Sequence, residues 1–275
     1  MWLSRILAAG LSLVTVGRLP TRAEDACPPG VLGVSRVMEI DALNGPRFGA
    51  PSGDPNFLAP GEVVLTFDDG PMPKYTRQIL AALAAQCTKA TFFSVGEMAA
   101  AYPAALKEVA SAGHTIGGHT WSHKNLARAS DEHAREEIEQ GFAALEHATG
   151  NPAAPFFRFP FLSESSFVIA YLKQHNIAMF AIDVDSQDWR IHSSSKLVEH
   201  VMAGLEHRHR GIILFHDIHA STVAALPTIL SMLKDKGLKV VHLRPKATVQ
   251  PIATSPAPRS NCLQGQARNR LSQCD

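Results

Sequence analysis

Two adjacent carboxylates, Asp68 and Asp69, stand in the segment TFDDGP at residues 66–71. The apolar run VVLTF at residues 63–67 predicts a strand that ends at this pair. Consecutive side chains of a strand point in opposite directions, so one carboxylate can bind a metal ion while the other moves a proton. The glycine and proline that follow predict an immediate turn. A polar turn capped by an aspartate is the alternative for this segment.

A second cluster offers imidazole nitrogens. His119 and His123 are four residues apart in the segment HTWSH and would share one face if the segment formed a helical turn. Neutral imidazole is a common ligand of zinc-like ions. With Asp69 the pair would supply two nitrogens and one oxygen, and three protein ligands with an open position are typical of a catalytic metal site. Taken alone, a surface pair is the alternative.

Two more clusters are rich in charge and aromatic side chains. Arg158 follows the aromatic pair at residues 156–157, at the end of a predicted strand where a site residue could lie. The alternative is that Arg158 is a solvated surface arginine. Residues 183–189 (DVDSQDW) place three acids beside Trp189. This pattern indicates a wet cleft with a hydrophobic wall, with ordinary surface acidity as the alternative.

The last cluster is LFHDIH at residues 214–219. An apolar strand would deliver His216 to the same face as the other clusters, where imidazole is suited to acid or base chemistry near neutral pH. A satisfied core histidine is the alternative. We expect His219 either to support the reactive groups from behind or to start a helix.

The elements that must position these clusters alternate regularly along the chain. Helical periodicity is present at residues 76–85, 104–112, 165–175, 194–207 and 222–236, and in a long helix that begins after Ser130 and ends before Gly150. Strands are predicted at residues 63–67, 90–95, 114–118, 156–157, 177–184, 212–215 and 238–243.

Strict alternation of strand and helix implies parallel strands with helical crossovers. Five of the strands run into a polar cluster at their C-terminal ends, and in a barrel these ends converge on the face where barrel enzymes carry their chemistry. We therefore expect an α/β fold, an irregular (β/α) barrel of about seven parallel strands with its active site at the C-terminal ends of the strands. An open doubly wound sheet also fits the order.

Together the clusters resemble the five ordered motifs of the NodB-type polysaccharide deacetylases, which include chitin and peptidoglycan deacetylases. The resemblance covers roughly residues 61–245, and it implies the same irregular barrel. It also implies a divalent metal, most simply Zn²⁺ with Co²⁺ or another divalent ion as alternatives, held by Asp69, His119 and His123. Phe161 stands where many relatives have tyrosine. The family uses the backbone N–H of that residue, so we expect phenylalanine in place of tyrosine to have little effect on activity.

The resemblance assigns catalytic roles to four side chains. Asp68 would take a proton as water attacks the acetamide carbonyl, and His216 would protonate the leaving sugar nitrogen. Arg158 would keep Asp68 ionised and in place, and Asp188 would orient His216 and favour its charged form. Three further residues are expected to contact substrate: the backbone N–H of Phe161 at the oxyanion, and the side chains of Trp189 and Leu214 around the acetyl methyl group.

The expected activity is removal of N-acetyl groups from amino sugars of a polysaccharide, with release of acetate. An esterase for O-acetyl groups, as in acetylated xylan, could use the same residues, because both reactions pass through a tetrahedral intermediate. The third alternative is a catalytically silent saccharide-binding protein. The sequence does not choose between peptidoglycan and a chitin-like oligomer. The string HDIH followed by Ser221 and Thr222 resembles the family members that act on cell walls slightly more than those that act on chitin-like oligomers.

The N-terminus predicts export. Arg5 precedes an apolar run at residues 6–16, and Thr21 and Ala23 offer a small-residue cleavage site. We expect residues 1–23 to be a signal peptide and the mature chain to be periplasmic or extracellular. The run is shorter than the roughly 20 residues needed to span a bilayer, so no stable membrane insertion is expected. An uncleaved anchor or a mis-chosen start is the alternative.

The rest of the chain divides by composition into an N-terminal arm at residues 24–60, a catalytic domain at 61–245 and a Pro-rich polar tail at 246–275. Basic and acidic side chains number 26 and 25, a net charge of +1, which gives no reason to expect nucleic acid as a partner. Nothing in the sequence indicates an oligomeric state.

Four cysteines of an exported chain allow three pairings, and the sequence alone does not choose between them. We favour Cys27–Cys87, which would tie the arm to the catalytic domain, and Cys262–Cys274, which would close a short loop in the tail.

Overall fold

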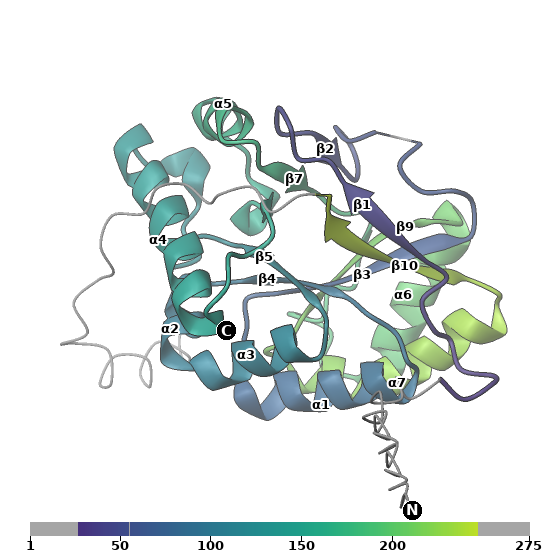
Figure 1. Cartoon of the computed structure of the whole chain (residues 1–275). Coiled ribbons are helices and arrows are strands. Elements are labelled where there is room, and N and C mark those ends of the chain that lie inside the picture. The colour runs from purple at the N-terminus through teal and green to yellow at the C-terminus, as the bar shows by residue number, and fades with distance from the viewer. Residues whose placement is uncertain (1–26, 55, 247–275) are drawn as a thin grey trace, which may run out of the picture.

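The computed structural model describes residues 27–54 and 56–246. Within them a parallel sheet lies at the centre, and helices pack around it, with α1, α3 and α7 together along one flank (Figure 1). The helices are α1 (Pro73–Ala85), α2 (Gly96–Ala101), α3 (Pro103–Ser111), α4 (Asp131–Thr149), α5 (Ser166–Gln174), α6 (Ser194–Arg208) and α7 (Ala220–Asp235). The strands are β1 (Arg36–Ile40), β2 (Arg47–Phe48), β3 (Glu62–Asp68), β4 (Thr91–Ser94), β5 (Thr115–Gly118), β6 (Phe156–Phe157), β7 (Ala178–Phe180), β8 (Val184–Asp185), β9 (Gly211–His216) and β10 (Lys239–Pro245).

The central strand β3 is buried along its whole length and pairs in parallel with β4 on one side and β9 on the other. From β4 the sheet continues through β5, β6 and β7 to β2, and from β9 it continues to β8. In the part of the chain that the structure describes, the sheet is not closed between β8 and β2, and an isolated antiparallel bridge joins Ala50 to Ile182 there. The expected α/β fold of parallel strands is confirmed, and its irregularity lies at this seam.

All six predicted helices are present, with α2 as an additional short one. The longest, α4, begins at the predicted cap, where the Ser130 side chain accepts a hydrogen bond from the His133 N–H. It ends at Gly150, whose φ of 74° is the left-handed conformation that glycine adopts without strain. Among the described residues, no helix combines the length and apolarity that a membrane crossing requires.

Two parts of the strand pattern differ from prediction. The run at residues 177–184 is split into β7 and β8, because the chain leaves β7 to pair with β9 and Asp183 turns inward to accept a hydrogen bond from the Ile212 N–H. The segment at residues 24–60 contains β1 and β2, although it shows no sustained periodicity. Their shortness and the exposure of β1 explain this, because a half-exposed strand lacks the apolar run that marks a buried one.

The predicted Cys27–Cys87 disulfide is present and joins the segment before β1 to the residues after α1. The pair Cys262–Cys274 and the predicted signal peptide at residues 1–23 lie outside the described residues.

Candidate active site

The polar clusters converge because the parallel strands end at the same level. Asp68 on β3 is in register with His216 on β9 and with Phe93 on β4. The neighbouring strand β5 ends at Gly118, so that His119 follows directly. Side chains that are up to 148 residues apart in the sequence therefore meet at the C-terminal ends of the strands β9, β3 and β5, which lie within a run of four adjacent strands with β4 between β3 and β5, as the barrel prediction requires.

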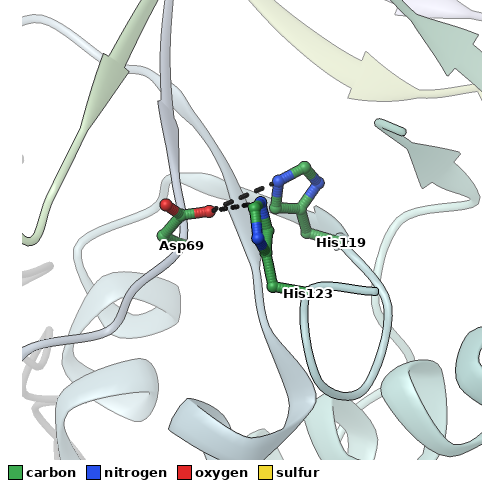
Figure 2. A group of neighbouring side chains, drawn as sticks. All are labelled: Asp69, His119 and His123. Carbon is green, nitrogen blue, oxygen red and sulfur yellow. Dashed lines mark ion pairs between the residues drawn. The ribbon is translucent and has the colours of Figure 1, made fainter. Parts of the chain in front are cut away.

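Asp69, His119 and His123 form a compact group of possible metal ligands (Figure 2). The Asp69 Oδ1 atom lies 3.4 Å from His119 Nε2 and 3.3 Å from His123 Nε2. This buried oxygen has no hydrogen-bond partner among the described residues. Burial raises the pKa of Asp69, but the imidazoles of His119, His216 and His123 together lower it by more, so the carboxylate is ionised.

The nitrogens of the two imidazoles are suited to bind a metal ion. His119 Nδ1 donates to the backbone carbonyl of Arg158 at 2.8 Å, so Nε2 is the nitrogen of this ring that can offer an electron pair on the side of Asp69. Burial lowers the pKa of His123, which favours the neutral form that binds metal ions. Two imidazole nitrogens and one carboxylate oxygen are typical donor atoms of a catalytic zinc site. The donor set therefore fits a metal ion.

The segment that carries the histidines is a loop and not the expected helical turn. Thr120 and His123 have φ angles of 65° and 56°, in the left-handed region that non-glycine residues rarely adopt. His119 and His123 share a target because the chain folds back sharply between them, and helical spacing has no part in it.

Asp68 and Arg158 form a buried ion pair beside the metal ligands. Arg158 Nη1 donates to Asp68 Oδ1 at 2.7 Å and to Thr66 Oγ1 at 2.8 Å. The Arg158 side chain is fully buried, so the alternative of a solvated surface arginine is wrong. Its other nitrogens donate to the carbonyls of Phe180 and Ala181 at the end of β7. The second oxygen of Asp68 lies 3.8 Å from His119 Nε2, on the side of the ligands.

His216 is held in an ion pair with the buried Asp188. His216 Nδ1 donates to Asp188 Oδ1 at 2.6 Å, and the His216 backbone N–H donates to Asp188 Oδ2 at 2.7 Å. Burial opposes the charge of His216, but the hydrogen bond and the negative charge of Asp188 raise its pKa to about 10. The opposite nitrogen, Nε2, lies 4.0 Å from Asp69 Oδ2. A protonated imidazole therefore faces the metal ligands across the site.

Asp188, His216 and His219 form a second compact group, and the 2.6 Å bond between His216 and Asp188 within it is a charge-assisted hydrogen bond. His219 stands at the N-cap of α7, with its ring centroid 5.7 Å from that of His216. The prediction of a helix-start residue is thus confirmed.

The family model described as "Polysaccharide deacetylase" matches residues 58–180, which include Asp68, Asp69, His119, His123 and Arg158. The chain is 34% identical over 186 residues to a peptidoglycan-N-acetylglucosamine deacetylase of Bacillus cereus, a match that covers 66% of this chain and 66% of that protein. The chain belongs to the polysaccharide deacetylase family.

Two further relatives define the breadth of the family. A chitooligosaccharide deacetylase of Azorhizobium caulinodans is 29% identical over 195 residues, covering 66% of this chain and 92% of that protein. A solved structure of a peptidoglycan deacetylase from Bdellovibrio bacteriovorus is 36% identical, with a TM-score of 0.72, and the alignment covers 79% of this chain and 61% of that one. The chain thus spans a little under two thirds of the B. cereus and B. bacteriovorus proteins.

The predicted substrate contacts of this family member are placed unevenly. Phe161 is 65% exposed, and its ring centroid lies 4.6 Å from that of His123, so it borders the ligand group. Leu214 is nearly buried, two residues before His216 on the same face of β9. Trp189 is 55% exposed, and the Arg190 guanidinium lies 5.8 Å from its ring centroid. An acetyl pocket between Trp189 and Leu214 stays a prediction.

Asp217 is one site residue that the sequence analysis missed. Its carboxylate is buried and accepts hydrogen bonds from the Gly70 N–H at 3.0 Å and from Thr76 Oγ1 at 2.6 Å. It fills the space in which a side chain on Gly70 would stand, since a Cβ there would lie 2.1 Å from Asp217 Oδ1. Burial raises the pKa of Asp217 to about 7. Its position next to His216 at a strand end was the available signal.

Glu137 is the second missed residue. It accepts hydrogen bonds from Ser122, which lies between the two histidine ligands. The signal was its spacing on α4, because Glu137 falls on the same helix face as the apolar residues Ala134, Ile138 and Phe142. A carboxylate on a buried helix face requires specific partners.

Proposed function

We propose that this protein is a metal-dependent hydrolase that removes N-acetyl groups from amino-sugar residues of a polysaccharide and releases acetate. The observation that carries the proposal is the buried, unpartnered Asp69 Oδ1 between two imidazole nitrogens, with a carboxylate and a protonated imidazole on either side. The names of the relatives support the same reaction class.

Asp69, His119 and His123 would hold the metal, for which we propose Zn²⁺. When bound, such an ion lowers the pKa of water from about 16 toward about 7 and polarises the amide carbonyl. The set of two nitrogens and one oxygen leaves room for water and substrate, as in catalytic zinc sites.

Asp68 is the proposed base. One of its oxygens is held by Arg158, and the other faces the ligand group, so a proton can be accepted there without loss of the ion pair. Arg158 itself is fixed by two backbone carbonyls and by Thr66, so the position of Asp68 is set by the barrel wall. Asp68 would remove a proton from water as the oxygen attacks the acetamide carbon.

His216 is the proposed acid. It is already protonated near neutral pH, and its Nε2 faces the opposite side of the ligand group. It would donate its proton to the sugar nitrogen as the carbon–nitrogen bond breaks, which yields acetate and a free amine. Asp188 would orient the ring and stabilise its charge throughout.

Three groups are proposed to contact the substrate. The backbone N–H of Phe161 would donate to the oxyanion, since preorganised donors at this position stabilise developing charge. Trp189 and Leu214 would surround the acetyl methyl group. The exposed rings of Phe161 and Trp189 also offer flat surfaces to sugar rings.

The proposed substrates are peptidoglycan and chitin-like oligosaccharides, which match the names of the relatives. We propose that the chain acts outside the cytoplasm, in the periplasm or beyond the cell. The N-terminal signal pattern and the Cys27–Cys87 disulfide support this, because disulfides persist in oxidising compartments. Residues 61–245 would form the catalytic domain, with residues 246–275 as a tail.

Acetate release tests the function. The purified chain is incubated with peptidoglycan, chitooligosaccharide and acetylated xylan, and acetate and product masses are measured before and after chelation and after zinc or cobalt is restored. We expect release from an N-acetylated glycan that stops on chelation and returns with the metal. Release from xylan alone would indicate an O-acetyl esterase, and activity indifferent to chelators would contradict the metal role.

A further inference from the structure

We propose that Glu137 on α4 is a positioning residue that holds the metal-ligand loop, residues 119–123, in its binding conformation through Ser122. This inference rests on the proposed metal site and adds the hydrogen bonds that would hold His123 in position to bind the metal.

The contact is direct and uses the whole carboxylate. Glu137 Oε2 accepts a hydrogen bond from the Ser122 backbone N–H at 2.8 Å, and Oε1 accepts one from Ser122 Oγ at 2.7 Å. Ser122 immediately precedes His123, so a bond to its N–H restrains the backbone that carries this ligand. Both oxygens of Glu137 are thus engaged by a single residue of the loop.

Glu137 is buried, and hydrophobic packing alone does not explain a carboxylate at a buried position. Glu137 is 4% exposed, no lysine or arginine of the described residues forms an ion pair with it, and the His133 Nε2 atom lies 3.9 Å from its Oε1 atom. A buried carboxylate is destabilising unless it is hydrogen-bonded, and an apolar residue would fill the same space without that cost. The hydrogen bonds from Ser122 therefore account for the carboxylate at this position.

The loop needs external bonds because its own backbone is strained. Thr120 and His123 both adopt the left-handed conformation, which is unfavourable for a non-glycine residue and persists only where the surroundings impose it. Without such bonds the segment would relax, and the His123 ring would leave the position 3.3 Å from Asp69 Oδ1.

The surrounding helices hold the loop on two further sides. At the start of α2, the Gly96 and Glu97 N–H groups donate to the carbonyls of Thr120 and Trp121 at 2.9 and 2.8 Å. On α4, Gly141 lies against the Thr120 backbone so closely that a Cβ would stand 2.7 Å from its carbonyl carbon. Glu137 and Gly141 are four residues apart, so one face of α4 provides both the hydrogen bonds and the close approach.

The positions of His119 and His123 depend to different degrees on the hydrogen bonds between Glu137 and Ser122. His119 directly follows β5 and is held separately, because its Nδ1 donates to the Arg158 carbonyl. His123 lies at the far end of the loop, and its described side-chain contacts are with Asp69 and with the rings of His119 and Phe161. Loss of Glu137 should therefore release His123 and leave His119 in place.

The test is metal affinity. The zinc dissociation constant is measured by chelator competition for the wild type, Glu137→Ala, Glu137→Gln, Ser122→Ala and His123→Ala. Glu139→Ala is the matched control, because Glu139 is a carboxylate of the same helix that accepts its hydrogen bond from Tyr171 on α5, away from the loop. Melting temperatures of the metal-free variants report any general loss of stability.

We expect Glu137→Ala to bind zinc about 10- to 100-fold more weakly, as for other groups that orient metal ligands. Its cobalt(II) absorption spectrum should resemble that of His123→Ala. Ser122→Ala keeps the bond from the backbone N–H, and Glu137→Gln keeps an acceptor for that bond and can donate to Ser122 Oγ, so both should lose less, with the smaller loss in Glu137→Gln. Glu139→Ala should keep wild-type affinity despite a lowered melting temperature.

Wild-type affinity and cobalt spectrum in folded Glu137→Ala would overturn the proposal. If that variant does not fold, the same result in Ser122→Ala, which lacks the bond from the Ser122 hydroxyl, would overturn it. A wild-type chain that binds no zinc would instead contradict the proposed function itself, so the two failures are distinguishable.

Discussion

The two halves of the site differ in how complete they are. On the side of β5, Asp69, His119 and His123 form a group of possible metal ligands in which Asp69 Oδ1 has no hydrogen-bond partner among the described residues, and the loop that carries the histidines is strained and held by neighbouring helices. On the side of β9, Asp188 and His216 form a closed ion pair whose hydrogen bonds are satisfied within the protein. Under the proposed function, one half would depend on an added cation, whereas the other is preorganised without it.

This difference agrees with the proposed tasks of the two halves. A metal site must keep its donor atoms free of protons so that the ion can bind them. A proton donor must keep its charge in the absence of substrate, so it requires a permanent counter-ion. Asp68 lies between them and belongs structurally to neither, since its partner Arg158 is fixed by the carbonyls after β7.

The largest effect is expected from Asp68→Asn. The amide cannot accept the proton from water, so kcat should fall by about 10²- to 10⁴-fold, whereas zinc content should stay at the wild-type level because Asp68 is not among the proposed ligands. Acetate release and metal analysis on the same preparation measure both. Normal turnover would show that the base is another group, and loss of zinc would place Asp68 in the metal half.

The next effect concerns the β9 half and its pH dependence. Asp188 raises the pKa of His216 to about 10, so His216 stays protonated, and the wild type should retain acid catalysis well above neutral pH. In Asp188→Asn the pKa of His216 falls, the proton is lost at lower pH, and the alkaline limb of the rate profile should shift downward by several pH units.

Zinc affinity provides the control for that variant. Asp188→Asn should bind zinc as the wild type does, because the two halves are separate. An unmoved alkaline limb would show that His216 is not the acid, and weakened zinc binding would show that the two halves are coupled.

A smaller effect is expected on thermal stability. Zinc at about 100 times its Kd stabilises the folded state by about 2.7 kcal/mol, which corresponds to a rise in Tm of about 5–10 °C for a chain of this size. The rise should be present in the wild type and in Asp188→Asn but absent in Asp69→Ala. Differential scanning calorimetry measures it, and an equal rise in Asp69→Ala would place the zinc elsewhere.

The smallest effect arises away from both halves. Burial lowers the pKa of His114 to about 3 and that of His242 to about 4, so both stay neutral in the fold but take up protons when unfolded below pH 6.5. Their contribution to stability is therefore present above pH 6.5 and is lost as the pH falls toward 4. Replacing His242 with Asn should reduce the fall in Tm between pH 7 and pH 5, and an unchanged fall would exclude this source.

The helices and most strands could be predicted because periodicity and caps are local. Ser130 and Gly150 mark the ends of α4 in the sequence, and the buried run before Asp68 marks β3. The loop at residues 119–123 could not, because its left-handed residues are imposed by α2 and α4. For the same reason β1 was missed, since its place is decided by pairing with β10, about 200 residues further along the chain.

The sequence by itself determined which side chains could take part in the chemistry. Residue type sets the donor atoms, and the alternation of strands and helices implies parallel strands whose C-terminal ends lie together. Only the tertiary structure decided which of them are held and by what: the Arg158 carbonyl on His119, the Glu137 carboxylate on Ser122 and the Asp217 carboxylate beside Gly70. These contacts join residues up to 147 positions apart. Such pairs leave no periodic trace along the chain, because they form only when the strands and helices have packed.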